Sequence, residues 1–209
     1  MSPAPLRWGN EAPNDPDVAR DRLLDAAQVC FRQHGISKTI VEDIARQAQV
    51  SRATVYRYFS GRDAVVSGVI LRETERYLER VQPRVESKPD LGGAILEFVA
   101  VANRAAQRDE MIGLLFNSDE GLNSGGIIEG TSVVLFEMVA DFLRPIFVKR
   151  ADEVKANVTV DDAAEWILRT FLSFLTVSGP RRRSDAGLNN YLRQFLLPSL
   201  VRQDRGIRG

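Results

Sequence analysis

Apolar residues recur at spacings of three and four along almost the whole chain, which is the spacing that places side chains on one face of an α-helix. The first clear example is a stripe that begins at Leu23 and Leu24 and ends at Phe31. No alternation of apolar and polar residues long enough for a half-buried strand interrupts this pattern, and no repeat or low-complexity tract is found. The pattern therefore predicts an all-α fold.

The composition is that of a chain with a substantial hydrophobic core. The chain has 209 residues, of which 44% are hydrophobic, enough for one ordinary domain or two small ones. Its single cysteine, Cys30, excludes both an internal disulfide framework and a cysteine-ligated metal site. The longest apolar stretches are too short to cross a bilayer, and no apolar signal core follows Met1. We therefore expect a soluble, cytoplasmic protein with no cofactor, no metal and no membrane partner.

The N-terminal segment is predicted to be an arm followed by a helix. Residues 1–16 hold four of the nine prolines and few apolar side chains, which is typical of a disordered arm. From Asp17 the pattern becomes helical, and Gly35 is placed to adopt the left-handed conformation that ends a helix. His34 lies in the last turn, where the helix dipole favours a cation, and no catalytic partner accompanies it.

Two short helices are predicted next. Thr39 and Glu42 have the spacing of a capping box, which predicts a helix that runs to about Ala48. Ser51 is the N-cap candidate of a second helix, over 52–59. Two helices of about two turns each, joined by about three residues and packed behind a longer helix, make a helix-turn-helix.

The rest of the chain is also predicted to be helical. Ser60 and Asp63 cap a long helix over 62–81, and residues 83–90 read as a linker. Pro145 is expected to kink or end its helix, and Asp161 to cap the one that follows. The further predicted segments are helices over 91–102, 111–116, 128–148, 161–177 and 186–201, with a glycine-rich break at 121–130.

Charge is distributed unevenly although the net charge is zero, with 28 basic and 28 acidic residues. Between Arg32 and Arg62 there are six basic residues and two acidic ones, Glu42 and Asp43, so the segment carries a local positive excess. Such an excess suits neutralisation of nucleic-acid phosphates, although ordinary protein surfaces also carry segments like it.

The segment from Ile44 to Asp63 reads IARQAQVSRATVYRYFSGRD. It combines an Ile-Ala pair, a turn that ends in Val-Ser, a Thr-x-Tyr-x-x-Phe run and a basic residue beside an acidic one. In this chain those features are Ile44-Ala45, Val50-Ser51, Thr54, Tyr56, Phe59 and Arg62-Asp63. Together they resemble the DNA-binding domain of the tetracycline-repressor (TetR) family, and the detailed resemblance covers roughly residues 17–70.

Two positions depart from the family pattern. Gln49 stands where family members usually carry a glycine, which predicts backbone strain or a shifted turn because glutamine tolerates positive φ poorly. Ile40 stands where a phosphate-contacting threonine is common, which leaves Thr39 as a displaced substitute.

The helix over 52–59 presents a polar face on geometry alone. If Val55 and Phe59 face the core, helical geometry places Arg57 on the opposite side. Arginine can pair with guanine, tyrosine and threonine hydroxyls can bond phosphates, and alanine permits close approach to a thymine methyl. Arg62, in the first turn of the next helix, is expected to bind a phosphate. The predicted DNA contacts are Thr39, Arg52, Ala53, Thr54, Tyr56, Arg57, Tyr58 and Arg62.

The resemblance implies three parts: a disordered arm (1–16), a helix-turn-helix domain (17–64) and a helical effector-binding and dimerisation domain (65–209). The helices over 161–177 and 186–201 are apolar around too much of their circumference for one buried face, so pairing in a homodimer, or burial within a monomer, is required. The resemblance places a small-molecule effector among the middle helices. The candidate lining residues are Phe98, Asn103, Phe116, Phe136 and Trp166.

The function indicated is that of a ligand-responsive transcriptional regulator, a repressor that binds a near-palindromic double-stranded DNA operator as a dimer. A lipophilic effector would suit the aromatic candidate lining. No phosphate loop, HExxH motif, nucleophile elbow or His and Cys cluster is found, so the chain is not expected to be an enzyme. A ligand-independent DNA-binding activator or architectural protein remains the alternative.

Overall fold

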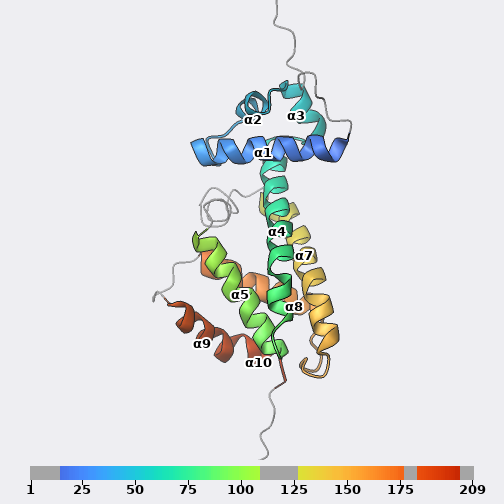
Figure 1. Ribbon diagram of the computed structural model, residues 1–209, viewed down its shortest axis with the longest axis vertical. Helices are drawn as coiled ribbons and strands as arrows, with labels where there is room; N and C mark the ends of the chain where they lie inside the picture. The colour runs from blue at the N-terminus through green and yellow to red at the C-terminus, as the bar shows by residue number, and fades with distance from the viewer. Residues whose placement is uncertain (1–14, 109–126, 177–182, 203–209) are drawn as a thin grey trace, which may run out of the picture. The chain divides into compact units, whose positions relative to one another are not determined.

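The computed structural model describes residues 15–108, 127–176 and 183–202. Within those ranges every regular element is a helix, which confirms the all-α prediction, and the one extended feature is an isolated bridge between Val154 and Val201. Figure 1 shows the helices. They are α1 (Pro16–His34), α2 (Val41–Gln47), α3 (Arg52–Tyr58), α4 (Arg62–Glu86), α5 (Leu91–Arg108), α7 (Ile127–Lys149), α8 (Val160–Thr176), α9 (Asp185–Phe195) and α10 (Leu197–Leu200).

The helices belong to two compact units. The first contains α1, α2, α3 and α4 as far as Glu73, and the second contains α4 from Thr74, α5, α7 from Ser132, and α8 to α10. The helix α4 therefore contributes to both units. The predicted domain boundaries after residues 16 and 64 divide the chain by the function of each part, and they stay predictions.

Helix α1 begins and ends at sequence signals. The Asp15 carboxylate accepts a hydrogen bond of 2.8 Å from the backbone N–H of Asp17, and Pro16 occupies the first turn, so the helix begins at the end of the predicted arm. Gly35 ends it with φ of +82°, as predicted. The inner face of α1 buries Leu23 and Phe31 completely.

The predicted cap of α2 is wrong by one residue. Ile40 precedes the helix, and its backbone N–H donates to the Asp43 carboxylate at 3.1 Å. Thr39 is instead fully buried, and its hydroxyl donates at 2.7 Å to the carbonyl of Gly35. The reason is local competition, because the carbonyls at the end of α1 lack helical partners and offer Thr39 an acceptor.

The turn between α2 and α3 bends through Gln49, whose φ is +57°. The backbone N–H of Val50 donates to Ala45 at 2.9 Å and that of Gln49 donates to Arg46 at 3.1 Å, which is the Schellman pattern of a helix end. The strained conformation predicted at Gln49 is therefore confirmed. The hydroxyl of Ser51 then caps α3, as predicted, by accepting from the backbone N–H of Thr54 at 3.1 Å.

Helix α4 extends beyond its predicted end. It continues through Pro83 to Glu86, so the first half of the predicted linker is helical. The guanidinium of the buried Arg150 donates to the carbonyl of Glu86 at 3.2 Å and to that of Lys88 at 2.5 Å. This long-range contact satisfies carbonyls that a helix end leaves free, and no local pattern could have predicted it.

The second unit has its own apolar core. Helix α5 packs against α8 and α9. Ile95 of α5, Ile146 of α7 and Ile167 of α8 are almost completely buried, and each such side chain stabilises the fold by roughly 1.5–3 kcal/mol. The Phe98 and Phe142 rings stack with centroids 5.0 Å apart.

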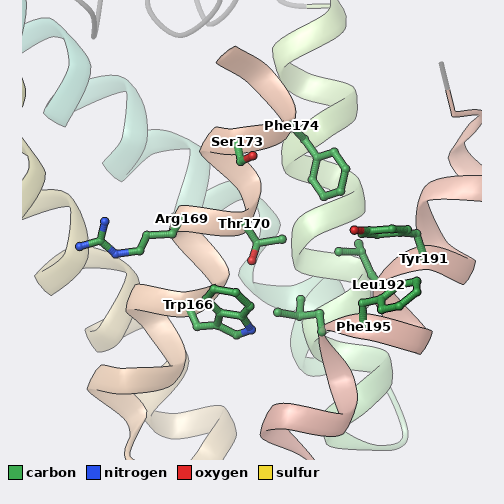
Figure 2. A pocket seen from close by; sticks show the side chains of 9 residues that line it. Trp166, Arg169, Thr170, Ser173, Phe174, Tyr191, Leu192 and Phe195 are labelled. Atoms are coloured by element: carbon green, nitrogen blue, oxygen red, sulfur yellow. The ribbon is translucent and has the colours of Figure 1, made fainter. Parts of the chain in front are cut away.

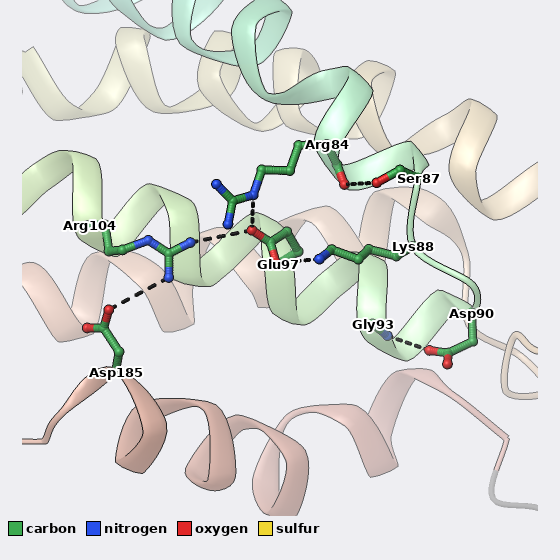
Figure 3. A network of polar contacts seen from close by, with 8 residues as sticks. All are labelled: Arg84, Ser87, Lys88, Asp90, Gly93, Glu97, Arg104 and Asp185. Atoms are coloured by element: carbon green, nitrogen blue, oxygen red, sulfur yellow. Dashed lines mark hydrogen bonds and ion pairs between the residues drawn. The ribbon is translucent and has the colours of Figure 1, made fainter.

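A charged network links α4, α5 and α9 of this unit around Glu97 (Figure 3). Arg84 lies 2.5 Å and Lys88 lies 2.8 Å from the Glu97 carboxylate. Arg104 lies 3.4 Å from the same carboxylate and 3.7 Å from Asp185. Burial raises the pKa of Glu97, but Lys88 and Arg84 more than compensate, so the pKa is lowered and the carboxylate stays charged.

Helix α7 confirms the predicted helix over 128–148 to within one residue at each end, and it continues past Pro145 to Lys149 rather than ending there. Two further boundaries differ from the predictions. Helix α8 is capped by Thr159 rather than Asp161, because the Thr159 hydroxyl accepts from the backbone N–H of Asp162 at 3.1 Å. The predicted last helix is divided into α9 and α10, with Pro198 in the first turn of α10. The predicted helix at 111–116 lies outside the described residues.

The turn at Gln49 makes a testable prediction about stability. A left-handed conformation costs a non-glycine residue roughly 1–2 kcal/mol, and glycine avoids this cost. Glycine in turn loses more backbone entropy on folding, which offsets roughly 0.5–1 kcal/mol of the gain. Gln49→Gly should therefore raise the free energy of unfolding by up to about 1 kcal/mol, whereas Gln49→Val should lower it. Thermal unfolding followed by circular dichroism measures both.

The matched control is Gln47→Gly. Gln47 is exposed in the last turn of α2, so glycine there should lower the free energy of unfolding by up to about 1 kcal/mol. Equal effects of glycine at positions 47 and 49 would contradict the role of the positive φ.

Candidate nucleic-acid interface

Helix α3 turns the predicted sides toward the core and toward solvent. Val55 is completely buried and Phe59 is 3% exposed, whereas Ala53 and Arg57 are exposed and Tyr56 is 55% exposed. Because the two apolar residues lie four apart, they set which side of this short helix faces outward. The exposed side therefore carries a small residue, a cation and a phenol.

Phe59 packs where two other helices approach closely. A side-chain carbon added to Gly68 of α4 would lie 3.0 Å from the Phe59 ring and 3.0 Å from Leu24 of α1. Glycine at this position thus lets α4 come near both side chains. The Arg20 guanidinium of α1 lies 4.3 Å from the centre of the Phe59 ring and donates to the carbonyl of Tyr58 at 3.1 Å.

Arg52 is exposed but paired. Its Nη1 atom donates to the carboxylate of Glu42, which is contributed by α2. The hydrogen bond from Arg52 lowers the pKa of Glu42, so the carboxylate stays charged over the physiological range. The pair joins the two helices of the helix-turn-helix at the first residue of α3.

Arg57 lies against the neighbouring phenol. The guanidinium carbon is 5.0 Å from the centre of the Tyr58 ring, and Nη2 donates to the Tyr58 hydroxyl at 3.3 Å. Thr54 is half-buried, and its hydroxyl lies 3.0 Å from that of Ser51. Arg57 is therefore exposed yet oriented by the residue that follows it.

The structure places Thr39 and Arg62 differently from the other predicted contacts. Arg62 points inward: its Nε donates to the carbonyl of Thr39 at 2.9 Å and its Nη2 to that of Ile36 at 2.6 Å. Only 25% of its side chain is exposed, and Thr39 is completely buried. Both residues hold the segment between α1 and α2.

Sequence reasoning missed Glu42 and Arg20 as parts of this surface. The sequence pattern predicts that Glu42 belongs to a capping box, whereas its carboxylate accepts a hydrogen bond from Arg52, ten residues later. Arg20 contacts Tyr58 and Phe59, which follow it by 38 and 39 positions in the sequence. Charge count pointed to a positive segment but could not show which arginines are paired with which carboxylates.

The predicted effector-lining residues that the structure describes lie on three helices, α5, α7 and α8, and their role in binding an effector stays a prediction. Phe98 is buried against Phe142, Asn103 is half-buried on α5, and Phe136 is half-buried with the Arg169 guanidinium 5.5 Å from its ring centre. Phe116 lies outside the described residues.

Trp166, the fifth predicted lining residue, borders a groove of about 320 Å³ between α8 and α9 (Figure 2). Trp166 is 48% exposed, and Phe195, which borders the same groove, is 56% exposed. Figure 2 shows Phe174 and Tyr191 along the groove. Their ring centroids lie 5.7 Å apart. The groove therefore carries aromatic side chains that one chain alone leaves partly exposed.

Within the described ranges, no three histidine, cysteine or carboxylate side chains gather where they could hold a metal ion. None of the helices described combines the length and the apolar content needed to span a bilayer.

Residues 23–69 match the model of the family described as bacterial regulatory proteins, tetR family. The chain is a TetR-family transcriptional regulator. An uncharacterized HTH-type transcriptional regulator of Mycobacterium tuberculosis (strain H37Rv) is 28% identical to this regulator over 182 residues, which are 87% of the chain and 85% of the relative. The HTH-type transcriptional regulator SrpR of Pseudomonas putida is 25% identical over 150 residues, 69% and 67% of the two chains. These relatives are regulators of transcription rather than enzymes.

Solved structures share the fold of this regulator. The fatty acid degradation regulator FadR of Bacillus halodurans matches with a TM-score of 0.59 at 17% identity, over 88% of this chain and 94% of that one. FadR of Bacillus subtilis matches with a TM-score of 0.58 at 18% identity, over 86% and 98%. The predicted class, a helix-turn-helix followed by a helical domain, is confirmed.

Proposed function

We propose that this regulator is a repressor that binds a near-palindromic DNA operator as a homodimer and leaves it when a small lipophilic effector binds. The observation that carries the proposal is the exposed polar side of α3, set by the burial of Val55 and Phe59. A helix anchored in this way can lie in the major groove with its side chains against base edges.

The contacts around α3 support different roles for the arginines. Arg52 and Arg57 are exposed, and we assign them to base reading, since a guanidinium can pair with guanine. Ala53 permits close approach, and the exposed Tyr56 supplies a hydroxyl for a phosphate. The proposed DNA contacts are Arg52, Ala53, Thr54, Tyr56, Arg57 and Tyr58, whereas Thr39 and Arg62 shape the segment before α2.

The exposed aromatic side chains of α8 and α9 support the homodimer. Leu192 of α9 is already buried within one chain, yet Trp166 and Phe195, which border the same groove, stay half-exposed. A second copy of the same two helices would cover them, as in a symmetric four-helix bundle. A dimer also explains how a short recognition helix achieves specificity, because two half-sites are read at once.

The effector proposal rests on chemistry and on similar structures. The structure of FadR of Bacillus subtilis contains stearoyl-CoA. The structure of FadR of Thermus thermophilus, a TetR-family repressor, contains lauroyl-CoA, and that protein is 21% identical to this regulator over 91% of this chain. The second unit of this regulator is rich in aromatic and aliphatic residues, which suits an apolar ligand. Long-chain acyl-CoA compounds are therefore the first effectors to test.

Selection of bound sequences from random duplexes tests the DNA proposal. We expect a near-palindrome with half-sites about one helical turn apart. Arg57→Ala should cost roughly 1–3 kcal/mol and relax the preference at one position of each half-site. Arg62→Ala should weaken binding to all sequences alike, because it removes the hydrogen bonds that hold the segment before α2. Equal, sequence-independent losses from both variants would contradict these roles. Salt-dependent binding without a preferred palindrome would favour the architectural alternative.

Sedimentation tests the dimer. The wild-type protein should have about twice the chain mass of 23.3 kDa at micromolar concentration. Replacing both Trp166 and Phe195 with Glu should give the single-chain mass, because two buried, unpaired carboxylates oppose association. Val148→Glu is the matched control, since Val148 is 71% exposed on α7 outside this surface. A wild-type protein of single-chain mass would overturn the proposal.

The operator complex provides the assay for the effector. Stearoyl-CoA should lower the operator affinity of the wild-type protein at constant salt, because a ligand shifts the equilibrium only by its differential affinity for two states. Free coenzyme A is the control for the head group. Operator affinity unaffected by every lipophilic compound that binds would contradict effector release and favour a ligand-independent regulator.

A further inference from the structure

The two arginines assigned to base reading are held by partners of different chemistry. Arg57 lies against the Tyr58 ring, whereas Arg52 is bonded to the Glu42 carboxylate. The side chain of Arg52 is 64% exposed and that of Glu42 is 39% exposed. A carboxylate this close to a DNA-reading cation repels phosphates, so its position requires an explanation beyond the stability of two short helices.

The geometry of the pair leaves Arg52 able to read a base. The bond to Glu42 uses Nη1 of the guanidinium. Arginine has five N–H donors in a planar fork, and the edge that carries Nε and Nη2 does not include Nη1. That edge has the two parallel donors that match O6 and N7 of guanine.

We propose that Glu42 is a specificity-determining residue, an inference that rests on the proposed function. Glu42 holds Arg52 in position to read a guanine, and it prevents the Arg52 guanidinium from binding phosphates regardless of the DNA sequence. Glu42 acts through Arg52 and touches no base itself, so it is a positioning residue. The pair carries no net charge, so Arg52 contributes little to sequence-independent attraction while Glu42 is present.

Removing the Glu42 carboxylate should change sequence preference and sequence-independent DNA affinity in opposite directions. Without the carboxylate, Arg52 is a flexible cation that can reach the nearest phosphate. Sequence-independent binding should then become tighter, and the slope of log affinity against log salt should steepen by up to about 0.9, the value for one more neutralised phosphate. Preference at the base that Arg52 reads should fall at the same time. A purely structural ion pair predicts neither change.

The experiment uses the full chain and the duplex obtained by selection with the wild-type protein. Binding is measured by competition at several salt concentrations, with duplexes that each carry one base change. The variants are Glu42→Gln, Glu42→Asp, Arg52→Ala and the double variant Glu42→Gln with Arg52→Ala. Glu79→Gln removes one exposed carboxylate from α4 and is the control for net charge. Thermal unfolding is recorded for every variant.

We expect the wild-type protein to discriminate about 5-fold to 150-fold at the position read by Arg52, which corresponds to one bidentate contact. Glu42→Gln should lose most of this discrimination at that position only, and should bind unrelated duplexes more tightly. Glu42→Asp keeps the charge but shortens the side chain, so it should lose discrimination without the tighter unrelated binding. The double variant should resemble Arg52→Ala, and Glu79→Gln should keep the wild-type preferences.

Several results would overturn the inference while leaving the proposed function intact. One is a Glu42→Gln variant with wild-type preference at every position. Another is a Glu42→Gln variant that binds all duplexes equally less well and unfolds at a lower temperature, which would make the pair structural. If Arg52→Ala keeps every preference, or the wild-type protein selects no preferred sequence, the proposed reading by Arg52 fails together with the inference.

Discussion

The anchoring of α3 through Val55 and Phe59 is the contact on which the rest of the candidate interface depends. Both side chains are buried, and the Phe59 ring packs where Gly68 lets α4 come close to Leu24. A helix of seven residues has too few internal hydrogen bonds to be stable alone, so this packing keeps it folded. The same packing sets its rotation, and the rotation decides which polar residues face outward.

The arginines of the first unit show how one residue type takes different roles through its surroundings. Arg62 gives its donors to backbone carbonyls, so it organises the segment before α2. Arg20 lies over Phe59 and bonds the end of α3. Arg52 and Arg57 stay exposed, one beside a carboxylate and one beside a phenol. A positive segment is therefore not a uniform phosphate-binding surface, because part of its charge serves the fold.

The second unit combines a closed core with an open aromatic surface. Ile95, Ile146 and Ile167 are buried within one chain, whereas Trp166 and Phe195 are not. The charged network around Glu97 links α9 to α5 and α4 (Figure 3). The aromatic surface and the network involve the same helix, α9, through Phe195 and Asp185 respectively.

Local signals predict that the chain is helical, they predict the positions of most helices, and they predict that Val55 and Phe59 face inward. These features can be predicted because apolar periodicity, helix caps and a left-handed turn involve residues at most five positions apart. The same signals placed the caps of α2 and α8 one or two residues away and ended α4 too early, since Gly35, Thr159 and Arg150 offered partners that competed with the predicted ones. Which arginine points inward, which is paired with Glu42 and which aromatic residues stay exposed were decided only by tertiary packing. Those outcomes depend on contacts between residues 10 to 64 positions apart, and no short pattern encodes such distances.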